Sequence, residues 1–179
     1  KNNTITKNQS SNGGGIYTKD SNITLESNTI SENQSSNNGG GGYIYNGTNT
    51  LVNNLVVGNS SRDGGGLHTF FGGGMLLVNN TFTGNSANSG GALRTFSTNM
   101  TLTNNILWGN SNGTNEIVQI GGTVSVANSI VQGGYVGNGN LNIDPLFVAP
   151  SDGNFRLQAQ SCAINTGDNG SVPSGMITD

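Results

Sequence analysis

The chain of 179 residues is long enough for one domain; 31% of its residues are hydrophobic, 8% are charged, and its net charge is −3. Its six lysines and arginines form no basic stripe, which argues against a nucleic-acid partner. No run of about 18 apolar residues occurs, so we expect no membrane insertion by this fragment. Because the net charge is low and apolar residues recur in register, we expect order rather than disorder.

One short segment, an apolar centre followed by asparagine, recurs along the chain. In chain order the copies are TITKN (4–8), TISEN (29–33), LVVGN (55–59), TFTGN (81–85), ILWGN (106–110) and a degenerate IVQGG (130–134). The repeats are 24–26 residues apart. A period held this closely predicts one structural unit stacked on copies of itself.

Each repeat consists of short apolar bursts interrupted by Gly-Gly or longer glycine runs. Helices with this much glycine are unfavourable, so short strands and tight turns are expected. Such repeats stack as a parallel β-helix, here of about six coils of 24–26 residues over residues 1–140. A leucine-rich repeat is the rival fold, since Leu102, Leu107 and Asn110 fit its pattern, but Asn105 occupies its second leucine position.

Three apolar columns should point into a three-sided coil. The columns are Ile5, Ile30, Val56, Phe82, Leu107, Val131; Leu25, Leu51, Leu77, Leu102, Val126; and Ile16, Ile44, Leu67, Leu93, Val118. A further column of asparagines (8, 33, 59, 85, 110) is expected in left-handed turn conformation, with side chains hydrogen-bonded along the axis.

A closing segment is expected at residues 141–179. Its apolar residues and two prolines, Pro145 and Pro150, can cover the exposed edges of the last coil without extending the sheets. The single cysteine, Cys162, excludes an internal disulfide and is expected to be a small buried hydrophobe. We expect that the segment is truncated at Asp179.

Beside the third column, large polar and aromatic residues should form a stripe on consecutive coils: Tyr17, Tyr45, His68, Arg94 and Gln119. Such side chains suit stacking on sugars and hydrogen bonding to them. An ordinary solvated face, or catalysis by His68 with Asp63 or Arg94, are the alternatives. No column holds two acids, so no catalytic residue is assigned. Glu32 should instead pair with Lys7, and no metal or cofactor is expected.

A second outer face carries threonines interrupted by apolar residues. The interruptions, Leu55, Val57, Ile106 and Trp108, form a candidate contact patch for another domain or chain. Regular threonine ranks would suit ice binding, and Thr4, Thr6, Thr29, Thr81 and Thr83 make up the incomplete ranks here.

Residues 82–93, FTGNSANSGGAL, resemble the FxxN and GGA motifs of polymorphic outer-membrane protein repeats, and residues 8–17 and 58–68 resemble looser copies. Residues 142–168 resemble the segment that closes right-handed β-helices in large bacterial surface proteins. The resemblance implies a right-handed β-helix in an extracellular, secreted or cell-surface setting.

The sequence therefore predicts a non-catalytic structural or adhesive module of a bacterial surface protein. Its expected partners are glycans, a host or neighbouring cell surface, or other domains of the parent chain. A carbohydrate-binding or polysaccharide-lyase-type β-helix is the first alternative, and an ice-binding surface is the second.

Overall fold

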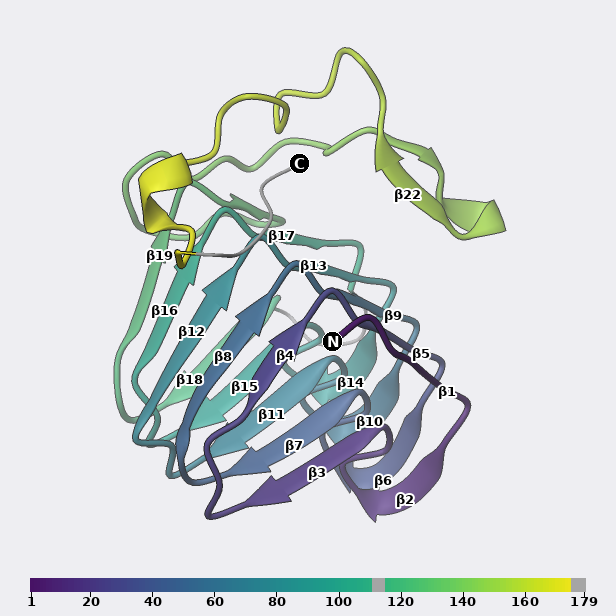
Figure 1. The fold of residues 1–179 in the computed structure, drawn as a ribbon. Helices are drawn as coiled ribbons and strands as arrows, with labels where there is room; N and C mark the ends of the chain where they lie inside the picture. The colour runs from purple at the N-terminus through teal and green to yellow at the C-terminus, as the bar shows by residue number, and fades with distance from the viewer. Residues whose placement is uncertain (111–114, 175–179) are drawn as a thin grey trace.

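The computed structural model describes residues 1–110 and 115–174, which form a right-handed parallel β-helix (Figure 1). Seen from its N-terminal end, the chain turns clockwise as it recedes, the hand that parallel β connections strongly favour. The first four coils each contribute one strand to each of four parallel sheets, which we call sheets A to D.

Sheet A is six-stranded, sheet B four-stranded, and sheets C and D are five-stranded. Sheet A contains β1 (Thr4–Thr6), β5 (Thr29–Ser31), β9 (Leu55–Val57), β13 (Thr81–Thr83), β17 (Ile106–Trp108) and β20 (Ile130–Val131). Sheet B contains β2 (Gln9–Asn12), β6 (Gln34–Asn38), β10 (Ser60–Asp63) and β14 (Ser86–Ser89). Sheet C contains β3 (Ile16–Lys19), β7 (Gly42–Tyr45), β11 (Leu67–Phe70), β15 (Leu93–Phe96) and β18 (Ile117–Ile120). Sheet D contains β4 (Thr24–Glu26), β8 (Thr48–Val52), β12 (Gly74–Val78), β16 (Met100–Thr103) and β19 (Val124–Ala127).

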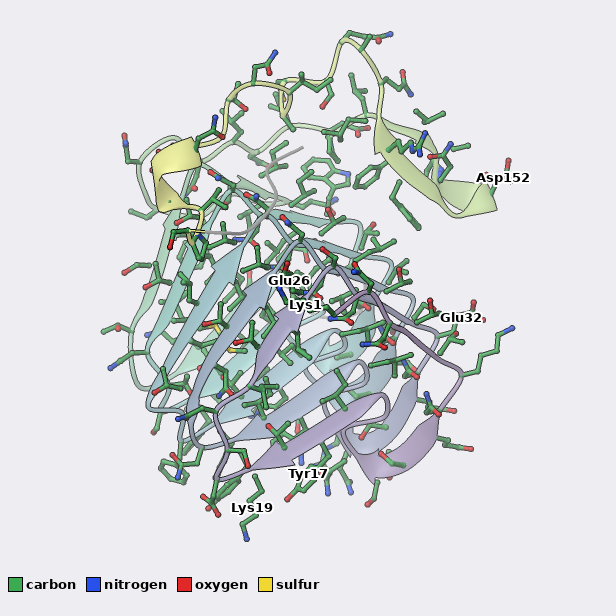
Figure 2. All side chains as sticks on the ribbon, viewed as in Figure 1. Lys1, Tyr17, Lys19, Glu26, Glu32 and Asp152 are labelled. Atoms are coloured by element: carbon green, nitrogen blue, oxygen red, sulfur yellow. The ribbon has the colours of Figure 1, made fainter. Side chains whose placement is uncertain are left out.

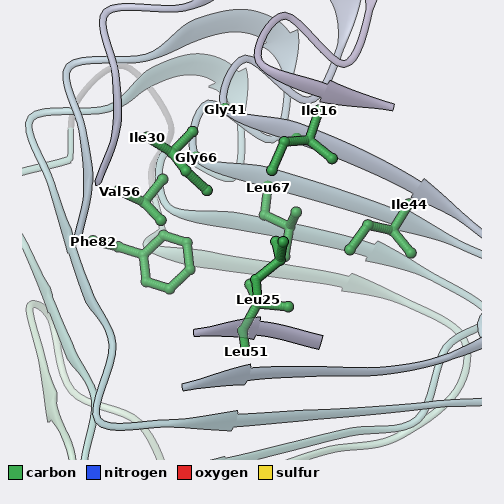
Figure 3. A pocket seen from close by; sticks show the side chains of 11 residues that line it. Ile16, Leu25, Ile30, Gly41, Ile44, Leu51, Val56, Gly66, Leu67 and Phe82 are labelled. Atoms are coloured by element: carbon green, nitrogen blue, oxygen red, sulfur yellow. The ribbon is translucent and has the colours of Figure 1, made fainter. Parts of the chain in front are cut away.

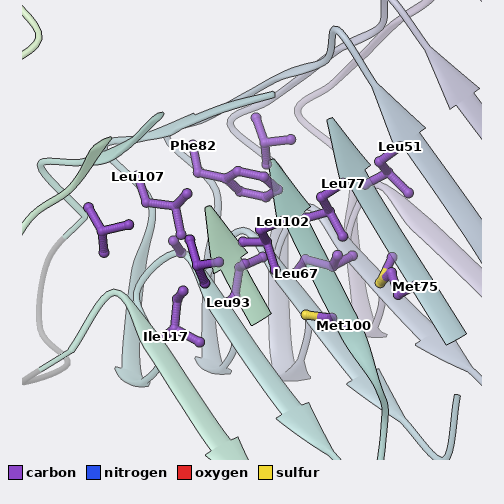
Figure 4. Close-up of a cluster of buried hydrophobic side chains, with 14 of the residues drawn as sticks. Leu51, Leu67, Met75, Leu77, Phe82, Leu93, Met100, Leu102, Leu107 and Ile117 are labelled. Carbon is purple, nitrogen blue, oxygen red and sulfur yellow. The ribbon is translucent and has the colours of Figure 1, made fainter. Parts of the chain in front are cut away.

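The first two predicted apolar columns are confirmed residue by residue. In sheet A, Phe82 pairs with Val56 on one side and Leu107 on the other. In sheet D, Leu77 pairs with Leu51 and Leu102. Their side chains fill the interior of the coil stack as one continuous buried cluster (Figure 4). Because each inward side chain lies over its counterpart in the next coil, the core extends along the whole stack.

The third predicted column is wrong in two coils. Leu67 pairs with Gly42, not with Ile44, and Leu93 pairs with Ile117, not with Val118. Ile44 lies one inward position farther along its strand, in register with Thr69. A small apolar void of about 10 Å³ lies in the interior, and Gly42 is one of the residues that line it. Figure 3 shows the side chains around it, among them Ile44 and Leu67.

The prediction of a three-sided coil is also wrong, because sheet B forms a fourth side. Its inward positions carry Ser10, Ser35, Ser61 and the small Ala87 rather than large apolar residues, so the hydrophobic pattern does not reveal it. Each serine hydroxyl donates a hydrogen bond of 2.8–3.0 Å to a backbone carbonyl. These bonds let a small polar side chain occupy a coil interior.

The asparagine column is a hydrogen-bonded ladder inside the stack. Asn59 Oδ1 accepts from the backbone N–H and the Nδ2 of Asn33, and Asn59 Nδ2 donates to Asn85 Oδ1 and to the carbonyl of Ile30. A second ladder runs through Asn3, Asn28, Asn54, Asn80 and Asn105 and ends on the hydroxyl of Ser129.

The left-handed conformation expected for the column asparagines is wrong by one residue. The residues with positive φ are those just before the ladder asparagines, Lys7, Glu32, Gly58, Gly84 and Gly109 in the first ladder. The turn is therefore made by the preceding residue, and the asparagine is selected for its amide. The predicted Lys7–Glu32 ion pair is present at 3.7 Å on this corner.

The closing segment begins where Leu141 forms an isolated parallel bridge to Ile130. It continues as the antiparallel pair β21 (Phe147–Ala149) and β22 (Asn154–Leu157), joined by the 3₁₀ turn η1 (Pro150–Asp152). It lies over the C-terminal end of the stack (Figure 1). It then returns along the coils to η2 (Asn169–Ser171), where Asp168 N–H and C=O both bond the side-chain amide of Asn104. Cys162 in this segment is only partly buried, not fully as expected.

Candidate functional site

The outer face of sheet C carries two rows of large side chains, and it gathers most of the predicted stripe. One row, which we call row one, lies at the second residue of each strand and consists of Tyr17, Tyr43, His68, Arg94 and Val118. The other, row two, is Lys19, Tyr45, Phe70, Phe96 and Ile120. Tyr17 and Lys19 point outward from β3 at one end of this face (Figure 2).

Of the predicted residues, Tyr17, His68 and Arg94 share row one, but Tyr45 does not. It belongs to row two, because Gly42 rather than Ile44 pairs with Leu67. Gln119 is in register with Thr95, an inward position, and its amide bonds the carbonyl of Gly122, so it is not part of the outer stripe.

Row two is an aromatic ladder that sequence reasoning missed. Tyr45 stacks on Phe70 with ring centroids 5.6 Å apart, and Phe70 stacks on Phe96 at 4.8 Å with their planes 15° apart. The Lys19 ammonium lies 5.6 Å from the centroid of the Tyr45 ring. The available signal was the repeated Thr-Phe of LHTF and LRTF, which places two phenylalanines on adjacent coils.

Phe71 extends this ladder from a strained position. It follows β11 with a φ of 53°, a conformation unfavourable for a bulky residue, while 49% of its surface stays exposed. Its ring packs edge-on against Phe70 at 4.6 Å and Phe96 at 5.4 Å. The same backbone conformation recurs at this corner in the other coils, at Asp20, Asn46, Ser97 and Gly121, so it belongs to the coil turn. The exposed ring of Phe71 broadens the apolar surface of the ladder.

A polar cluster adjoins the ladder in row one, centred on His68. The ring is 2% exposed and its Nδ1 lies 2.9 Å from Asn38 Oδ1. Asn38 uses its amide nitrogen to donate to Asn12 Oδ1 at 2.7 Å, so we assign the imidazole proton to Nδ1. The other nitrogen, Nε2, is then an acceptor, 3.4 Å from Arg94 Nη1.

Burial, with a further contribution from the Arg94 charge, lowers the pKa of His68 to about 4. The imidazole is therefore neutral at physiological pH. Since both ring nitrogens are engaged and the ring is buried, the geometry does not present His68 as a general base. The carboxylate of Asp63 is also engaged, because it pairs with Arg62 Nε at 3.2 Å and with Arg94 Nη1 at 3.6 Å.

The candidate contact patch lies on the outer face of sheet A. Leu55, Val57, Ile106 and Trp108 are all half-buried there, and their rows are shared with threonines. Part of this face borders a groove of about 770 Å³, whose lining includes Ile106 together with Leu157 and Ile164 of the closing segment. The chain's own closing segment therefore flanks the patch.

Within residues 1–110 and 115–174, no three or more His, Cys, Asp or Glu side chains gather in a group that could hold a metal ion. The same part of the chain contains no helix with the length and apolar character needed to span a membrane.

The comparisons with known proteins give one family. A family model described as "Periplasmic copper-binding protein (NosD)" matches residues 1–92, about half of the chain. No curated protein and no solved structure matches the chain.

Proposed function

Because the chain belongs to the NosD family, whose description is periplasmic, we propose that it is an exported, non-catalytic β-helix module that adheres to glycans through the outer face of sheet C. The match supports the β-helix repeat but not the narrower resemblance to polymorphic outer-membrane protein repeats. In this proposal the coil stack is a rigid support, and the two rows of sheet C are the adhesive surface.

The aromatic ladder is the observation that carries the proposal. Tyr45, Phe70 and Phe96 stack continuously across three coils, and their outward rings are flanked by Tyr17, Tyr43 and charged side chains. Flat aromatic surfaces with hydrogen-bonding groups at their edge suit sugar rings, whose faces are apolar and whose rims are polar. Parallel strands repeat every ~4.8 Å, so a glycan lying along the axis would meet equivalent side chains at each coil.

Copper, the metal of the family description, does not fit the described residues. Protein copper sites use imidazole, thioether and thiolate ligands. The chain has one histidine and one cysteine. The nitrogens of His68 are engaged by Asn38 and Arg94, while Met75 and Met100, neighbours in sheet D, are buried in the apolar core (Figure 4). We therefore assign no copper step to these residues.

Binding to an array of bacterial and host glycans, followed by calorimetry with the strongest oligosaccharide, tests the proposal. Phe70→Ala should weaken binding roughly five- to tenfold, because it removes the central ring of the ladder. Val57→Ala on the outer face of sheet A is the matched control and should leave affinity unchanged. Absence of glycan binding, or equal loss in both variants, would contradict the proposal. Release of unsaturated sugars would contradict its non-catalytic part.

A further inference from the structure

Arg94 lies beside the aromatic ladder on β15, the strand next to the C-terminal end of sheet C, and its guanidinium contacts two side chains. Its Nη1 is 3.4 Å from His68 Nε2 and 3.6 Å from Asp63 Oδ2, and its side chain is 19% exposed. In sheet C its strand neighbours are His68 and Val118, and the next outward residue of its own strand is Phe96 of the ladder. One end of the guanidinium is thus fixed beside the aromatic surface.

The neutral state of His68 explains how the guanidinium is oriented. Asn12 bonds Asn38, Asn38 accepts from His68, and His68 offers Nε2 to Arg94. In this series of hydrogen bonds, each residue fixes which atom of the next one donates and which accepts. A cationic imidazole would have no lone pair for Arg94, so the low pKa of His68 is consistent with a role as acceptor. His68 is a positioning residue for Arg94.

The arrangement leaves one donor of Arg94 without a partner. Its Nε is buried and forms no hydrogen bond with any described residue. Buried donors are nearly always satisfied, so this orphan shows that the guanidinium is incompletely paired within the protein. Because Nε itself is closed off from solvent, a ligand carboxylate would meet the exposed part of the guanidinium, whose planar fork of donors favours carboxylates.

The charges around Arg94 favour an anionic ligand although the chain as a whole has a net charge of −3. At the far end of the face, Lys19 is followed by Asp20, whose carboxylate accepts from Asn46. Lys19 flanks the ladder at one end, and Arg62 lies beside Asp63 at the edge of sheet B. Asp63 is shared between Arg62 and Arg94. The two arginines and one aspartate therefore leave the polar cluster with a single positive charge, since His68 is neutral.

We propose that Arg94 determines the specificity of the sheet C face by selecting glycans that carry a carboxylate. This inference rests on the proposed glycan-binding function and adds the class of sugar: acidic sugars whose carboxylate pairs with Arg94 while the ring stacks on the aromatic ladder. Sulfated and phosphorylated sugars are the competing anionic ligands.

The test is an array in which carboxylated oligosaccharides are printed beside the same glycans with the carboxylates esterified, together with sulfated and phosphorylated glycans. The acidic forms should bind roughly tenfold more tightly than their esters, and Arg94→Gln should remove that difference. Arg156→Gln, which removes a cation from the closing segment, should preserve it. Circular dichroism and thermal melting confirm that each variant is folded.

Binding of acidic and esterified forms with equal affinity would overturn this inference and leave the glycan-binding function intact. Preference for sulfated or phosphorylated glycans alone would overturn the carboxylate assignment. Absence of binding to every glycan would overturn the proposed function itself. As a direct readout, the Nε–H resonance of Arg94 should shift on addition of the acidic oligosaccharide; an unmoved resonance would contradict the contact.

Discussion

At the scale of single residues, the stacked asparagines hold the coils together by directional bonds as well as by burial. Asn59 is fully buried and its amide contacts three other residues, all of them in adjacent coils. Its removal would leave several buried donors and acceptors without partners. Buried groups left unsatisfied are more destabilising than the average hydrogen bond is stabilising.

Asn59→Ala should therefore lower the free energy of unfolding by about 3 kcal/mol or more. Asn8→Ala is the matched control, because Asn8 occupies the same ladder at its exposed N-terminal end. That variant should lose less than about 1 kcal/mol. Urea denaturation of the three proteins measures the difference. Equal losses for Asn59 and Asn8 would show that the ladder amides are not the source of the stability.

Two buried titratable groups should give opposite pH dependences. The pKa of His68 is lowered from 6.5 to about 4, so the unfolded chain binds more protons in that range and its contribution to stability rises with pH. Burial raises the pKa of Glu116 from 4.5 to about 7, against hydrogen bonds from Asn110, so its contribution falls as pH rises through that range. The two effects oppose each other between pH 4.5 and 6.5.

Removing either group should reveal the other. The melting temperature of Glu116→Gln should rise relative to the wild type as pH increases from 4.5 to 6.5, and that of His68→Gln should fall. Calorimetric melts across this range provide the measurement. Parallel curves for all three proteins would mean that neither pKa is shifted by folding.

At the scale of strands, glycine decides how closely neighbouring coils approach. The conformation of Gly42 is open to other residues, and a Cβ there would lie 3.1 Å from the flexible end of Leu67, beside the internal void. A Cβ on Gly41 would instead lie 2.5 Å from the backbone carbonyl oxygen of Gly66. Adjacent glycines in one run therefore have different roles.

Gly42→Ala should stabilise the protein by about 0.5–1 kcal/mol, since it adds apolar contact and restricts the unfolded chain. Gly41→Ala should destabilise it by about 2 kcal/mol or more, because the backbone of the next coil must move. Thermal and urea unfolding compare the two variants directly. Destabilisation by Gly42→Ala comparable to that of Gly41→Ala would show that the interior has no room at this position.

The strand pattern also explains which parts of the fold could be predicted from sequence. The columns through Phe82 and Leu77 could be predicted, because every member is apolar and the spacing is regular. The inward column of sheet C could not be predicted, because inward Thr69 is polar and Gly42 has no side chain, so the apolar pattern points to Ile44 instead of Gly42. Sheet B could not be predicted, because inward serines replace the apolar pattern there. Their hydroxyls donate hydrogen bonds to backbone carbonyls, as that of Ser35 does.

At the scale of the whole molecule, the repeat places residues one period apart side by side on the outer face of sheet C. The period places His68 on Arg94 and Phe70 on Phe96 without any long-range information, so half of the candidate site could be predicted. The network from Asn12 through Asn38 to His68 could not, because it crosses the corner between sheets B and C. Such contacts depend on side-chain direction, which spacing alone does not give.

The adhesive role of sheet C is the central claim, and chemical-shift mapping on the isotopically labelled protein tests it most directly. On titration with the oligosaccharide that binds most strongly on the array, the amide and aromatic signals of Tyr45, Phe70, Arg94 and Phe96 should shift together. Those of Leu55 and Val57 on the outer face of sheet A should stay in place. Shifts confined to sheet A or to the closing segment, with sheet C unchanged, would contradict the account.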